Sequence, residues 1–332
     1  MSDPTRPQRP RVIVTRQLAP MAEARMAELF EVVLSADDHA MTREELVAAV
    51  RDCDVLVPTL TDQIDAQLIE AAGERLKLIA NFGNGTDHID LKAARAKGVI
   101  VTNTPGVFTE DTADMAMALI LAVPRRLAEG EKLVRTGQWK GWTPSGMLGH
   151  RIGGKILGII GMGRIGRAVA RRAAAFGLSV HYHNRRRLPP EVEAELGASY
   201  HATPDTLLRI ADIVSIHCPH TPETHEMVSA PRIASMKPSA YIINTARGEI
   251  IEEEALVDAL EKGRLAGAGL DVYSHGANID PRLLGLDNVV LLPHMGSATF
   301  EGREASGERV TANIKAWSDG HRPPDQVLEG WM

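Results

Sequence analysis

The sequence is poor in residues that cross-link a protein or anchor it in a membrane. Cysteine occurs only at Cys53 and Cys218 in 332 residues, which excludes a disulfide framework and a CxxC metal or redox motif. No segment approaches the roughly 20 apolar residues of a membrane-spanning helix. The polar start of the chain has no apolar signal-peptide segment behind it. We therefore expect a cytoplasmic protein that is neither exported nor inserted in a membrane.

Charge and histidine patterns argue against two further classes of protein. The formal net charge is -6 and the basic residues are scattered, which is not typical of a nucleic-acid-binding surface. His181 and His183 lie two residues apart without an evident third ligand, and no HExxH motif occurs, so we expect no metal site. The length and the 44% of apolar residues fit two globular domains of ordinary size.

Short β-rich runs alternate with helical stretches along most of the chain. This alternation is typical of parallel sheets, and it predicts two α/β domains with doubly wound parallel sheets. The first series of strands is expected at residues 12–15, 31–34, 55–57, 78–81 and 100–103. The second series is expected near residue 156 and at residues 179–183, 213–216, 240–244, 267–270 and 289–292.

Two helical stretches bear on the domain boundaries. Residues 111–135 are rich in Ala, Met and Leu, and they predict one long helix that bends at Pro124. Residues 302–317 again show helical spacing after the last expected strand. We expect this last helix to return to the first domain, which would make that domain discontinuous.

A glycine-rich motif follows the first strand of the second series. The apolar run 155–160 leads into Gly161-Met162-Gly163-Arg164-Ile165-Gly166, and residues 167–176 continue with helical spacing. In this context the GxGxxG pattern predicts a dinucleotide site, because its glycines allow a tight turn, close approach of a pyrophosphate and close packing of the helix on the strand. The alternative is a glycine-rich turn in an ordinary α/β unit.

The residues after the next strand predict which cofactor is preferred. An NAD site usually places an acidic residue against the ribose hydroxyls at this point, whereas the sequence has Asn184 followed by Arg185, Arg186 and Arg187. Guanidinium groups bind a 2′-phosphate with paired hydrogen bonds, and a carboxylate would repel it. We expect NADP(H) to be preferred and NAD(H) to remain possible, with Asn184, Arg185 and Arg186 at the nucleotide. The alternative is a solvated basic loop unrelated to the cofactor.

Three further segments follow strands of the second series. They are residues 244–248 with Arg247, residues 269–272 with Asp271, and residues 292–297 with His294. Open α/β sheets bind ligands at the carboxyl ends of their strands. There an Arg can hold a carboxylate and polarise the adjacent carbonyl, and a His can transfer the proton that accompanies hydride transfer. Singly, each residue also has a structural interpretation, as a surface ion pair or a capped loop residue.

Together with the GxGxxG motif, these segments make the chain resemble the D-isomer-specific 2-hydroxy acid dehydrogenases, most closely their glyoxylate and hydroxypyruvate reductases. The resemblance also includes residues 81–90, 101–105 and 112–114. It implies hydride transfer between a nicotinamide and a small 2-keto or 2-hydroxy acid. By this resemblance Arg247 would anchor the carboxylate and the keto oxygen, His294 would be the acid/base, and the backbone amides of Asn84 and Gly85 would bind the carboxylate.

The resemblance also implies the remaining organisation. Residues 1–103 and 299–332 would form a flavodoxin-like substrate domain, and residues 104–298 a dinucleotide-binding Rossmann domain. Asp271 would meet the nicotinamide carboxamide, and the other cofactor-lining residues would be Thr112, Cys218, Pro219, Thr224, Thr245, Ala246, His294 and Gly296. A homodimer is expected from the resemblance and from the apolar segment 115–123, whose burial is hard to complete within one subunit.

One position departs from the family pattern. Gly276 and Ala277 stand where the family usually has a Glu-Pro pair whose carboxylate holds the catalytic imidazole. An imidazole without that acceptor is less well oriented and titrates nearer its free value of about 6.5. The sequence therefore predicts NADPH-dependent reduction of glyoxylate or hydroxypyruvate. It leaves open a dehydrogenase for a bulkier 2-keto acid, and a weakly active or non-catalytic NADP(H)-binding relative.

Overall fold

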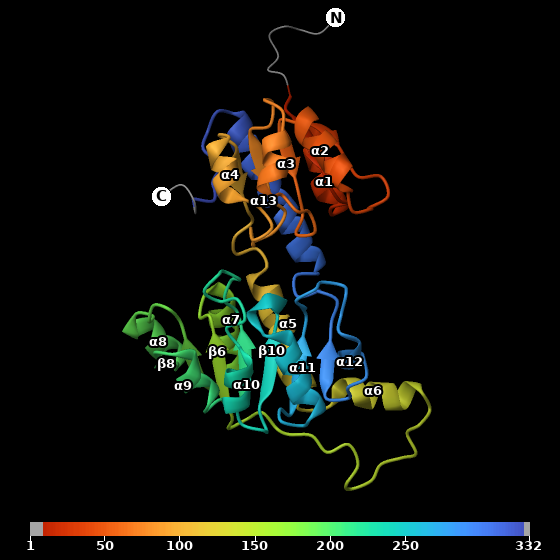
Figure 1. Cartoon of the computed structure of the whole chain (residues 1–332), viewed down its shortest axis with the longest axis vertical. Coiled ribbons are helices and arrows are strands. Elements are labelled where there is room, and N and C mark those ends of the chain that lie inside the picture. Colours follow the sequence, from red (N-terminus) through yellow and green to blue (C-terminus); the bar gives the residue numbers. More distant parts are fainter. Residues whose placement is uncertain (1–8, 329–332) are drawn as a thin grey trace, which may run out of the picture. The chain divides into compact units, whose positions relative to one another are not determined.

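A computed structural model describes residues 9–328, so most of the polar start of the chain lies outside the described residues. The chain forms two compact units (Figure 1). The first unit contains the residues up to Phe108 together with those from Ala298 onward, and the second contains Thr109–Ser297. The first unit is thus built from two separate stretches of sequence. Within the described part, no helix is long and apolar enough to cross a bilayer.

The first unit is a five-stranded parallel sheet with helices on both faces. Its strands lie in the order β2-β1-β3-β4-β5, with bounds β1 Arg11–Val14, β2 Glu31–Val33, β3 Val55–Val57, β4 Leu78–Ala80 and β5 Ile100–Thr102. Its helices are α1 Pro20–Leu29, α2 Arg43–Asp52, α3 Ala66–Ala71, α4 Leu91–Ala96 and α13 Phe300–Ser318. In the register of the sheet, Val12 pairs with Val32 on one side and Val55 on the other.

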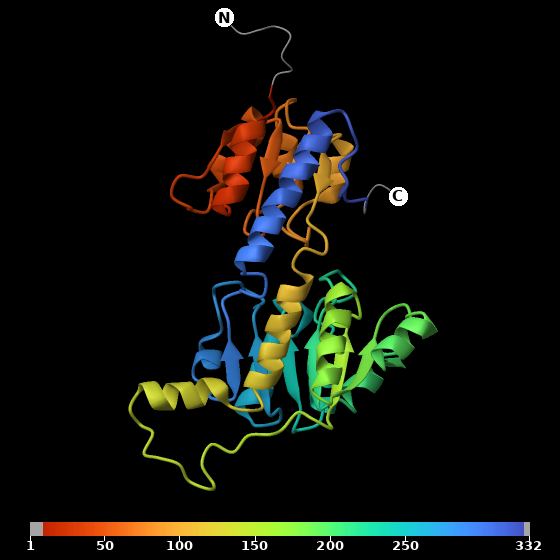
Figure 2. The ribbon, with the colours of Figure 1, turned by 180° about the vertical axis from the view of Figure 1, so that it is seen from behind.

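Alternate residues of the central strands enter two different hydrophobic layers, because successive side chains of a strand point to opposite faces. Ile13 and Leu56 pack with residues of α2, α3 and α4. Val12 and Val55 pack with residues of α1 and α13. Figure 2 shows α13, in blue, in front of the strands of this unit. Burial of both faces explains why these strands have continuous apolar sequences.

The second unit is a seven-stranded parallel sheet. Its strands lie in the order β12-β11-β10-β9-β6-β7-β8, with bounds β6 Ile156–Ile160, β7 Ser179–His183, β8 Ser199–His201, β9 Ile213–Ile216, β10 Tyr241–Asn244, β11 Gly267–Leu270 and β12 Val289–Leu291. The order changes direction between β6 and β9, and such a switch point is where open α/β sheets bind ligands. The two predicted parallel sheets are therefore confirmed; the short edge strand β8 was not expected.

Helices cover both faces of this second sheet. Residues of α5, α7 and α8 pack on one face, and residues of α9, α10, α11 and α12 pack on the other. The bounds are α5 Thr109–Ala122, α6 Leu127–Arg135, α7 Arg164–Ala175, α8 Pro190–Leu196, α9 Pro204–Leu208, α10 Ala230–Ser235, α11 Glu253–Glu261 and α12 Pro281–Leu284, with a 3₁₀ turn η1 at Gly248–Ile250.

The prediction of one bent helix over residues 111–135 is wrong in its continuity. The chain forms α5 and α6 separately, and it turns around Pro124 between them. Proline disfavours the helical conformation of the residue before it and lacks an N–H for the helix ladder. Arg126, just before α6, has a left-handed φ of +54°, and the Pro124 carbonyl accepts the N–H of His150 at 2.8 Å instead of a helical partner. The turn is thus fixed by tertiary contacts.

The expectation that the apolar residues of segment 115–123 are hard to bury within one subunit is also wrong. Met117, Leu119 and Ile120 are buried within the second unit itself, in the layer that α5 forms with α7. Exposed apolar side chains occur elsewhere in the chain; in α6 and the segment after it, Val134, Trp139 and Trp142 are 61%, 56% and 82% exposed.

The last helix packs on the first unit. Helix α13 covers the predicted stretch 302–317 and contacts α1 and β4. Arg309 of α13 binds Asp325, which follows the helix, with a distance of 2.7 Å between Nε and Oδ2. Gln326 forms a β-bridge with Thr102, the last residue of β5. The C-terminal stretch thus completes the core of this unit.

Candidate active site

The loop between β6 and α7 requires its glycines for different reasons. Gly161 has a φ of +97°, and a Cβ there would lie 2.5 Å from the backbone nitrogen of Cys218. A Cβ on Gly166 would lie 2.3 Å from the carbonyl oxygen of Gly161. A Cβ on Gly163 would meet nothing within 4 Å. The fold itself therefore demands Gly161 and Gly166, whereas Gly163 leaves open space beside the helix N-terminus.

This loop fits the pyrophosphate of a dinucleotide. Gly163 is the N-cap of α7 and provides no side-chain cap, so the first N–H groups of the helix, beginning with those of Arg164 and Ile165, have no acceptor within the helix. Such groups bind phosphates together with the positive end of the helix dipole. Asn184 Oδ1 accepts the N–H of Met162 at 2.6 Å. The residue that replaces the usual acid therefore also holds the loop in place.

The three arginines after β7 have different surroundings. Arg187 pairs with Glu193, with a distance of 2.7 Å between Nη2 and Oε2. The hydrogen bonds from Arg187 and from the Tyr182 hydroxyl lower the pKa of Glu193 to about 2. Arg185 and Arg186 are exposed, and neither forms an ion pair within residues 9–328. Arg187 is therefore held by an ion pair, whereas Arg185 and Arg186 form none among the described residues.

Thr245, the residue after β10, has a buried hydroxyl without a partner. Its Oγ1 forms no hydrogen bond to any described residue. Such a group costs free energy unless a ligand or water satisfies it. The next peptide is fixed, because the Ala246 N–H donates to Asn244 Oδ1 at 3.0 Å. An unsatisfied hydroxyl at the carboxyl edge of the sheet is a second feature that fits a bound cofactor.

The loop after β9 lies against the glycine loop. A Cβ on Gly161 would clash with the backbone of Cys218 in this loop. Burial raises the pKa of the Cys218 thiol to about 12, so the sulfur stays protonated and unreactive at neutral pH. Thr224 Oγ1 donates to the Pro219 carbonyl at 2.7 Å and thereby holds the same loop. These three predicted cofactor residues therefore belong to one ordered segment beside the switch point.

Arg247 follows a rigid turn after β10. Asn244 Nδ2 donates to the Arg247 carbonyl at 2.8 Å, and Arg247 Nη1 donates to the Ala246 carbonyl at 2.8 Å. A Cβ on Gly248 would lie 2.0 Å from the carbonyl carbon of Tyr273, so the turn packs directly on the chain that follows β11. The half-buried guanidinium is thus held at the carboxyl edge of the sheet.

His294 has a strained backbone that its neighbours hold in place. Its φ is +55°, a conformation that costs about 1–3 kcal/mol in residues other than glycine. The Asp271 carboxylate accepts the N–H groups of Met295 and Gly296, both at 2.7 Å. The Tyr273 hydroxyl donates to the Leu292 carbonyl at 2.9 Å. Asp271 and Tyr273, which both follow β11, therefore fix the residues that precede and follow His294 in the sequence.

The structure gathers several of the predicted residues at this edge. Strands β10, β11 and β12 are neighbours, so Arg247, Asp271 and His294 all lie beyond the carboxyl ends of adjacent strands. A Cβ on Gly296 would lie 2.9 Å from Asp271 Oδ2 and 3.7 Å from Cγ2 of Thr112. Each Asp271 oxygen keeps a second acceptor position. Its contact with a nicotinamide carboxamide stays a prediction.

Gly276 differs from the family's Glu in backbone as well as in side chain. It has a left-handed φ of +58°, and a Cβ there would meet nothing within 4 Å. A residue before proline is restricted to extended conformations, so a Glu-Pro pair would give this turn another shape. His275, the neighbouring imidazole, is exposed.

Asn84 and Gly85 belong to the first unit, in the loop that follows β4. Their backbone N–H groups donate to no acceptor within the described chain. Three residues to which sequence reasoning gave no role surround this loop, namely Asn81, His88 and Asn103. The sequence places them only in segments that carry the family resemblance, because nothing in their spacing indicates which backbone groups they bind.

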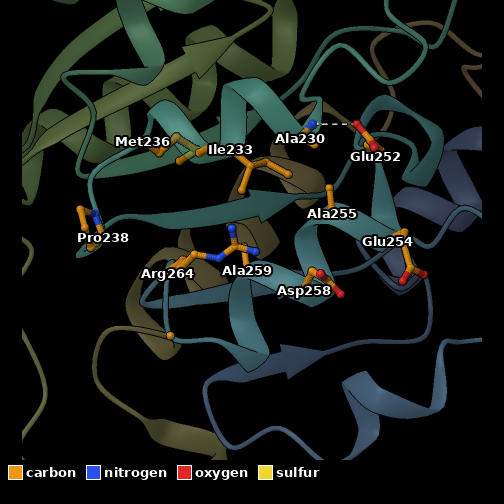
Figure 3. A pocket seen from close by; sticks show the side chains of 12 residues that line it. Ala230, Ile233, Met236, Pro238, Glu252, Glu254, Ala255, Asp258, Ala259 and Arg264 are labelled. Atoms are coloured by element: carbon orange, nitrogen blue, oxygen red, sulfur yellow. Dashed lines mark hydrogen bonds between the residues drawn. The ribbon is translucent and has the colours of Figure 1, made fainter.

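Other polar clusters lie away from these residues. A cavity of about 610 Å³ is lined by α10 and α11, with Ile233, Glu252 and Arg264 among its residues (Figure 3), and none of the candidate site residues lines it. His181 binds His201 across β7 and β8, with 3.0 Å between Nδ1 and Nε2. Within residues 9–328, no group of three or more His, Cys, Asp or Glu side chains is arranged to hold a metal ion.

Comparison with known proteins agrees with this geometry. Residues 117–296 match the model of the D-isomer specific 2-hydroxyacid dehydrogenase, NAD binding domain. A glyoxylate reductase of Thermococcus onnurineus is 46% identical over 323 residues, or 96% of each chain. A glyoxylate reductase of Pyrococcus furiosus is 42% identical over 323 residues, which cover 96% of this chain and 95% of that one.

Solved structures of similar proteins share the whole architecture. The NADPH-dependent glyoxylate/hydroxypyruvate reductase of Sinorhizobium meliloti, in complex with NADP and malonate, has a TM-score of 0.86 at 36% identity, covering 97% of this chain and 98% of that one. A glyoxylate reductase from Paecilomyes thermophila has a TM-score of 0.87 at 33% identity, covering 98% and 99%. The family model spans more than half of this chain, and the similarity to relatives extends over nearly all of it. The chain therefore belongs to the D-isomer specific 2-hydroxyacid dehydrogenase family and is an NAD(P)-dependent oxidoreductase.

Proposed function

We propose that this protein reduces a small 2-keto acid, glyoxylate or hydroxypyruvate, to the 2-hydroxy acid with NADPH. The observation that carries the proposal is that Arg247 and His294 follow β10 and β12, the two strands that flank β11, while Asp271 after β11 fixes the loop that contains His294. A module that only bound nucleotide would need neither the guanidinium nor the strained histidine. The names of the relatives support the substrate class.

Each group has a distinct task in this reaction. The Arg247 guanidinium binds the substrate carboxylate and polarises the keto oxygen, because its planar fork matches two oxygens at once. His294 donates a proton to that oxygen as negative charge develops on it. The N–H groups of Asn84 and Gly85 bind the carboxylate. A bound NADPH supplies the hydride that the keto carbon accepts.

The same proposal assigns nucleotide and substrate to different units. The second unit, with the glycine loop and the exposed Arg185 and Arg186, binds the cofactor and prefers NADPH. The first unit, which corresponds to residues 1–103 and 299–332 of the expected substrate domain, contributes the loop with Asn84 and Gly85. The cytoplasm is the proposed compartment, because the chain has only two cysteines and both are free thiols.

We also propose a homodimer formed through α6 and the segment that follows it. Helix α6 has no buried residue, and Trp142 is 82% exposed. Apolar surface of this kind marks interaction sites. Sedimentation equilibrium at micromolar concentration should give twice the chain mass, and a stable monomer would contradict this part of the proposal.

The main test is NADPH oxidation with glyoxylate as the substrate. The parent protein should turn over glyoxylate, and its rate should fall as pH rises, because the protonated imidazole is the reactive form for reduction. Arg247→Ala should lower kcat/KM at least about 100-fold, since it removes a charged group aimed at the developing oxyanion. Arg264→Ala, a change beside the remote cavity, is the matched control. Equal turnover in both variants would contradict the assigned role of Arg247.

The open space at Gly276 supports a second candidate function, reduction of a bulkier 2-keto acid. Comparing kcat/KM for glyoxylate and phenylpyruvate separates the two candidates. A higher value for phenylpyruvate would favour the bulkier substrate. Turnover of neither acid, with NADPH still bound, would favour a binding-only relative.

The departure at Gly276 can itself be tested by restoring the family pair. Gly276→Glu together with Ala277→Pro should place a carboxylate near the imidazole, stabilise its protonated form, raise the reductive rate and extend that rate to higher pH. The single change Gly276→Glu should cost about 1 kcal/mol of stability, because a left-handed backbone disfavours a side chain. An unchanged pH profile in the double variant with intact NADPH binding would mean that position 276 does not face His294.

A further inference from the structure

In the loop between β4 and α4, the three successive carbonyls of residues 83–85 all accept hydrogen bonds. The Gly83 carbonyl accepts Asn81 Nδ2 at 3.1 Å and the backbone N–H of Thr104 at 3.0 Å. The Asn84 carbonyl accepts Asn103 Nδ2 at 2.7 Å. The Gly85 carbonyl accepts Asn81 Nδ2 at 2.8 Å. Two side-chain amides thus bind three successive carbonyls.

Fixing these carbonyls also fixes the N–H groups of the loop. In a trans peptide the carbonyl and the following N–H point in opposite directions, and the described chain has no cis peptide bond. The Gly83 carbonyl therefore sets the direction of the Asn84 N–H, and the Asn84 carbonyl sets that of the Gly85 N–H. Neither N–H donates to an acceptor within residues 9–328. Each of these two adjacent N–H groups thus points away from the side-chain amide that binds the carbonyl of its own peptide.

His88 determines which way the Asn81 amide faces. Its Nε2 lies 3.0 Å from Asn81 Oδ1, and both residues are buried. Because Asn81 Nδ2 already donates to two carbonyls, Oδ1 is the acceptor, and His88 Nε2 must carry the proton. A flipped amide would place Oδ1 against the Gly83 and Gly85 carbonyl oxygens and leave His88 without this acceptor. The imidazole therefore selects the one amide orientation that holds the loop.

We propose that Asn81, His88 and Asn103 are positioning residues for the substrate carboxylate. They hold the peptide planes of residues 83–85 so that the N–H groups of Asn84 and Gly85 meet a planar monocarboxylate, while none of the three touches the substrate itself. This inference rests on the proposed function, because it takes the carboxylate to be that of the 2-keto acid. A neutral amide at residue 81 is part of the device, since a carboxylate there would repel both the carbonyls and the substrate.

The first experiment separates positioning from folding with a matched pair of changes at one residue. His88→Gln retains a side-chain N–H that reaches Asn81, and His88→Leu removes it. We expect His88→Leu to raise KM for glyoxylate and the inhibition constant for oxalate, a planar analogue, at least about tenfold, as for loss of hydrogen bonds to a charged group. His88→Gln should stay within about threefold of the parent, a difference of less than one ordinary hydrogen bond. The dissociation constant for NADPH should be the same in all three proteins.

Asn81→Asp gives a stronger version of the same test. The change keeps the shape of the side chain but removes both donors, so KM for glyoxylate should rise further than in His88→Leu, with unchanged NADPH affinity. An unchanged KM in Asn81→Asp, or equal KM values in His88→Leu and His88→Gln, would overturn the inference. If Asn81→Asp fails to fold, the His88 pair decides the question.

Amide NMR on the full chain separates this inference from the proposed function. Oxalate added to the NADPH-loaded parent should shift the backbone amide signals of Asn84 and Gly85, and these shifts should vanish in His88→Leu. Absence of both shifts in the parent would overturn the inference. Shifts in the parent without turnover of any 2-keto acid would support the anion loop while contradicting the proposed reductase activity.

Discussion

Two loops of this protein follow buried strands and have backbone N–H groups without an acceptor among residues 9–328, and the two loops are built differently. After β6, the donors are the first residues of α7, and the loop shape comes from Gly161 and Gly166, whose Cβ atoms would strike backbone. After β4, the donors are Asn84 and Gly85, and the loop shape comes from side-chain amides behind it. The first loop depends on the side chains that its glycines lack, and the second depends on the side-chain amides of Asn81 and Asn103.

This difference should appear in the tolerance of the two loops to an added methyl group. Gly161→Ala meets a backbone nitrogen at 2.5 Å and a left-handed φ, so we expect a loss of about 3 kcal/mol or more of stability, with loss of NADPH binding. Gly83→Ala meets only Asn81 Nδ2 at 3.5 Å, an ordinary contact, and should cost less than about 1 kcal/mol. Midpoints of thermal unfolding measure both. Equal shifts would mean that the two loops are not built differently.

A second change tests whether the open space at Gly163 serves the ligand and not the fold. Gly163→Ala adds a methyl group where nothing lies within 4 Å. The unfolding midpoint should change by the equivalent of less than about 1 kcal/mol, which is the cost of a poorer N-cap. The affinity for NADPH should fall about tenfold or more, because the methyl group keeps the pyrophosphate from the helix N–H groups. Isothermal titration with NADPH measures this, and unchanged affinity would place the pyrophosphate elsewhere.

The smallest expected effect concerns the positive charges of Arg185 and Arg186, which follow β7 and supplement the loop after β6 in the proposed cofactor site. Arg185→Ala or Arg186→Ala should narrow the preference for NADPH over NADH about tenfold, the value of one charge-assisted phosphate contact. Arg187→Ala is the matched control. It breaks the ion pair with Glu193, so it should lower stability and leave the preference unchanged. If Arg187→Ala changes the preference for NADPH over NADH and the other two variants do not, Arg187 contacts the nucleotide and Arg185 and Arg186 do not.

Most of the fold could be predicted because its signals are local. The buried strands β3 and β9 have mainly apolar and β-branched residues, and their ends match the expected bounds. The edge strand β8 was missed because three half-exposed residues, Ser199–His201, carry no apolar pattern. Asn81 and Asn103 were expected to end strands, yet each begins a loop. A strand pattern in the sequence does not show that the side-chain amide of its last residue binds the carbonyls of a loop.

The active-site residues divide in the same way. Arg247 and His294 could be proposed because functional side chains cluster at the carboxyl ends of parallel strands. The roles of Asp271 and Tyr273 in holding the histidine loop could not, because their partners Met295 and Leu292 lie about twenty residues away in sequence. The ion pair of Arg187 with Glu193 could not either, because three successive arginines give no sign of which one pairs. The break between α5 and α6 was likewise decided by His150, a residue beyond the range of any helical pattern.

The sequence by itself determined the two parallel sheets and the glycine loop, because each depends on periodicity or on a steric need that one residue type satisfies, and it indicated the proposed catalytic pair by its place after strands. Only the tertiary structure decided which arginines are free for the nucleotide, how a strained histidine is held, and that Asn81, His88 and Asn103 orient the loop with Asn84 and Gly85. These are matters of which hydrogen-bond partners the folded chain brings together. A polar side chain carries the capacity to donate or accept, and the folded chain alone selects its partner.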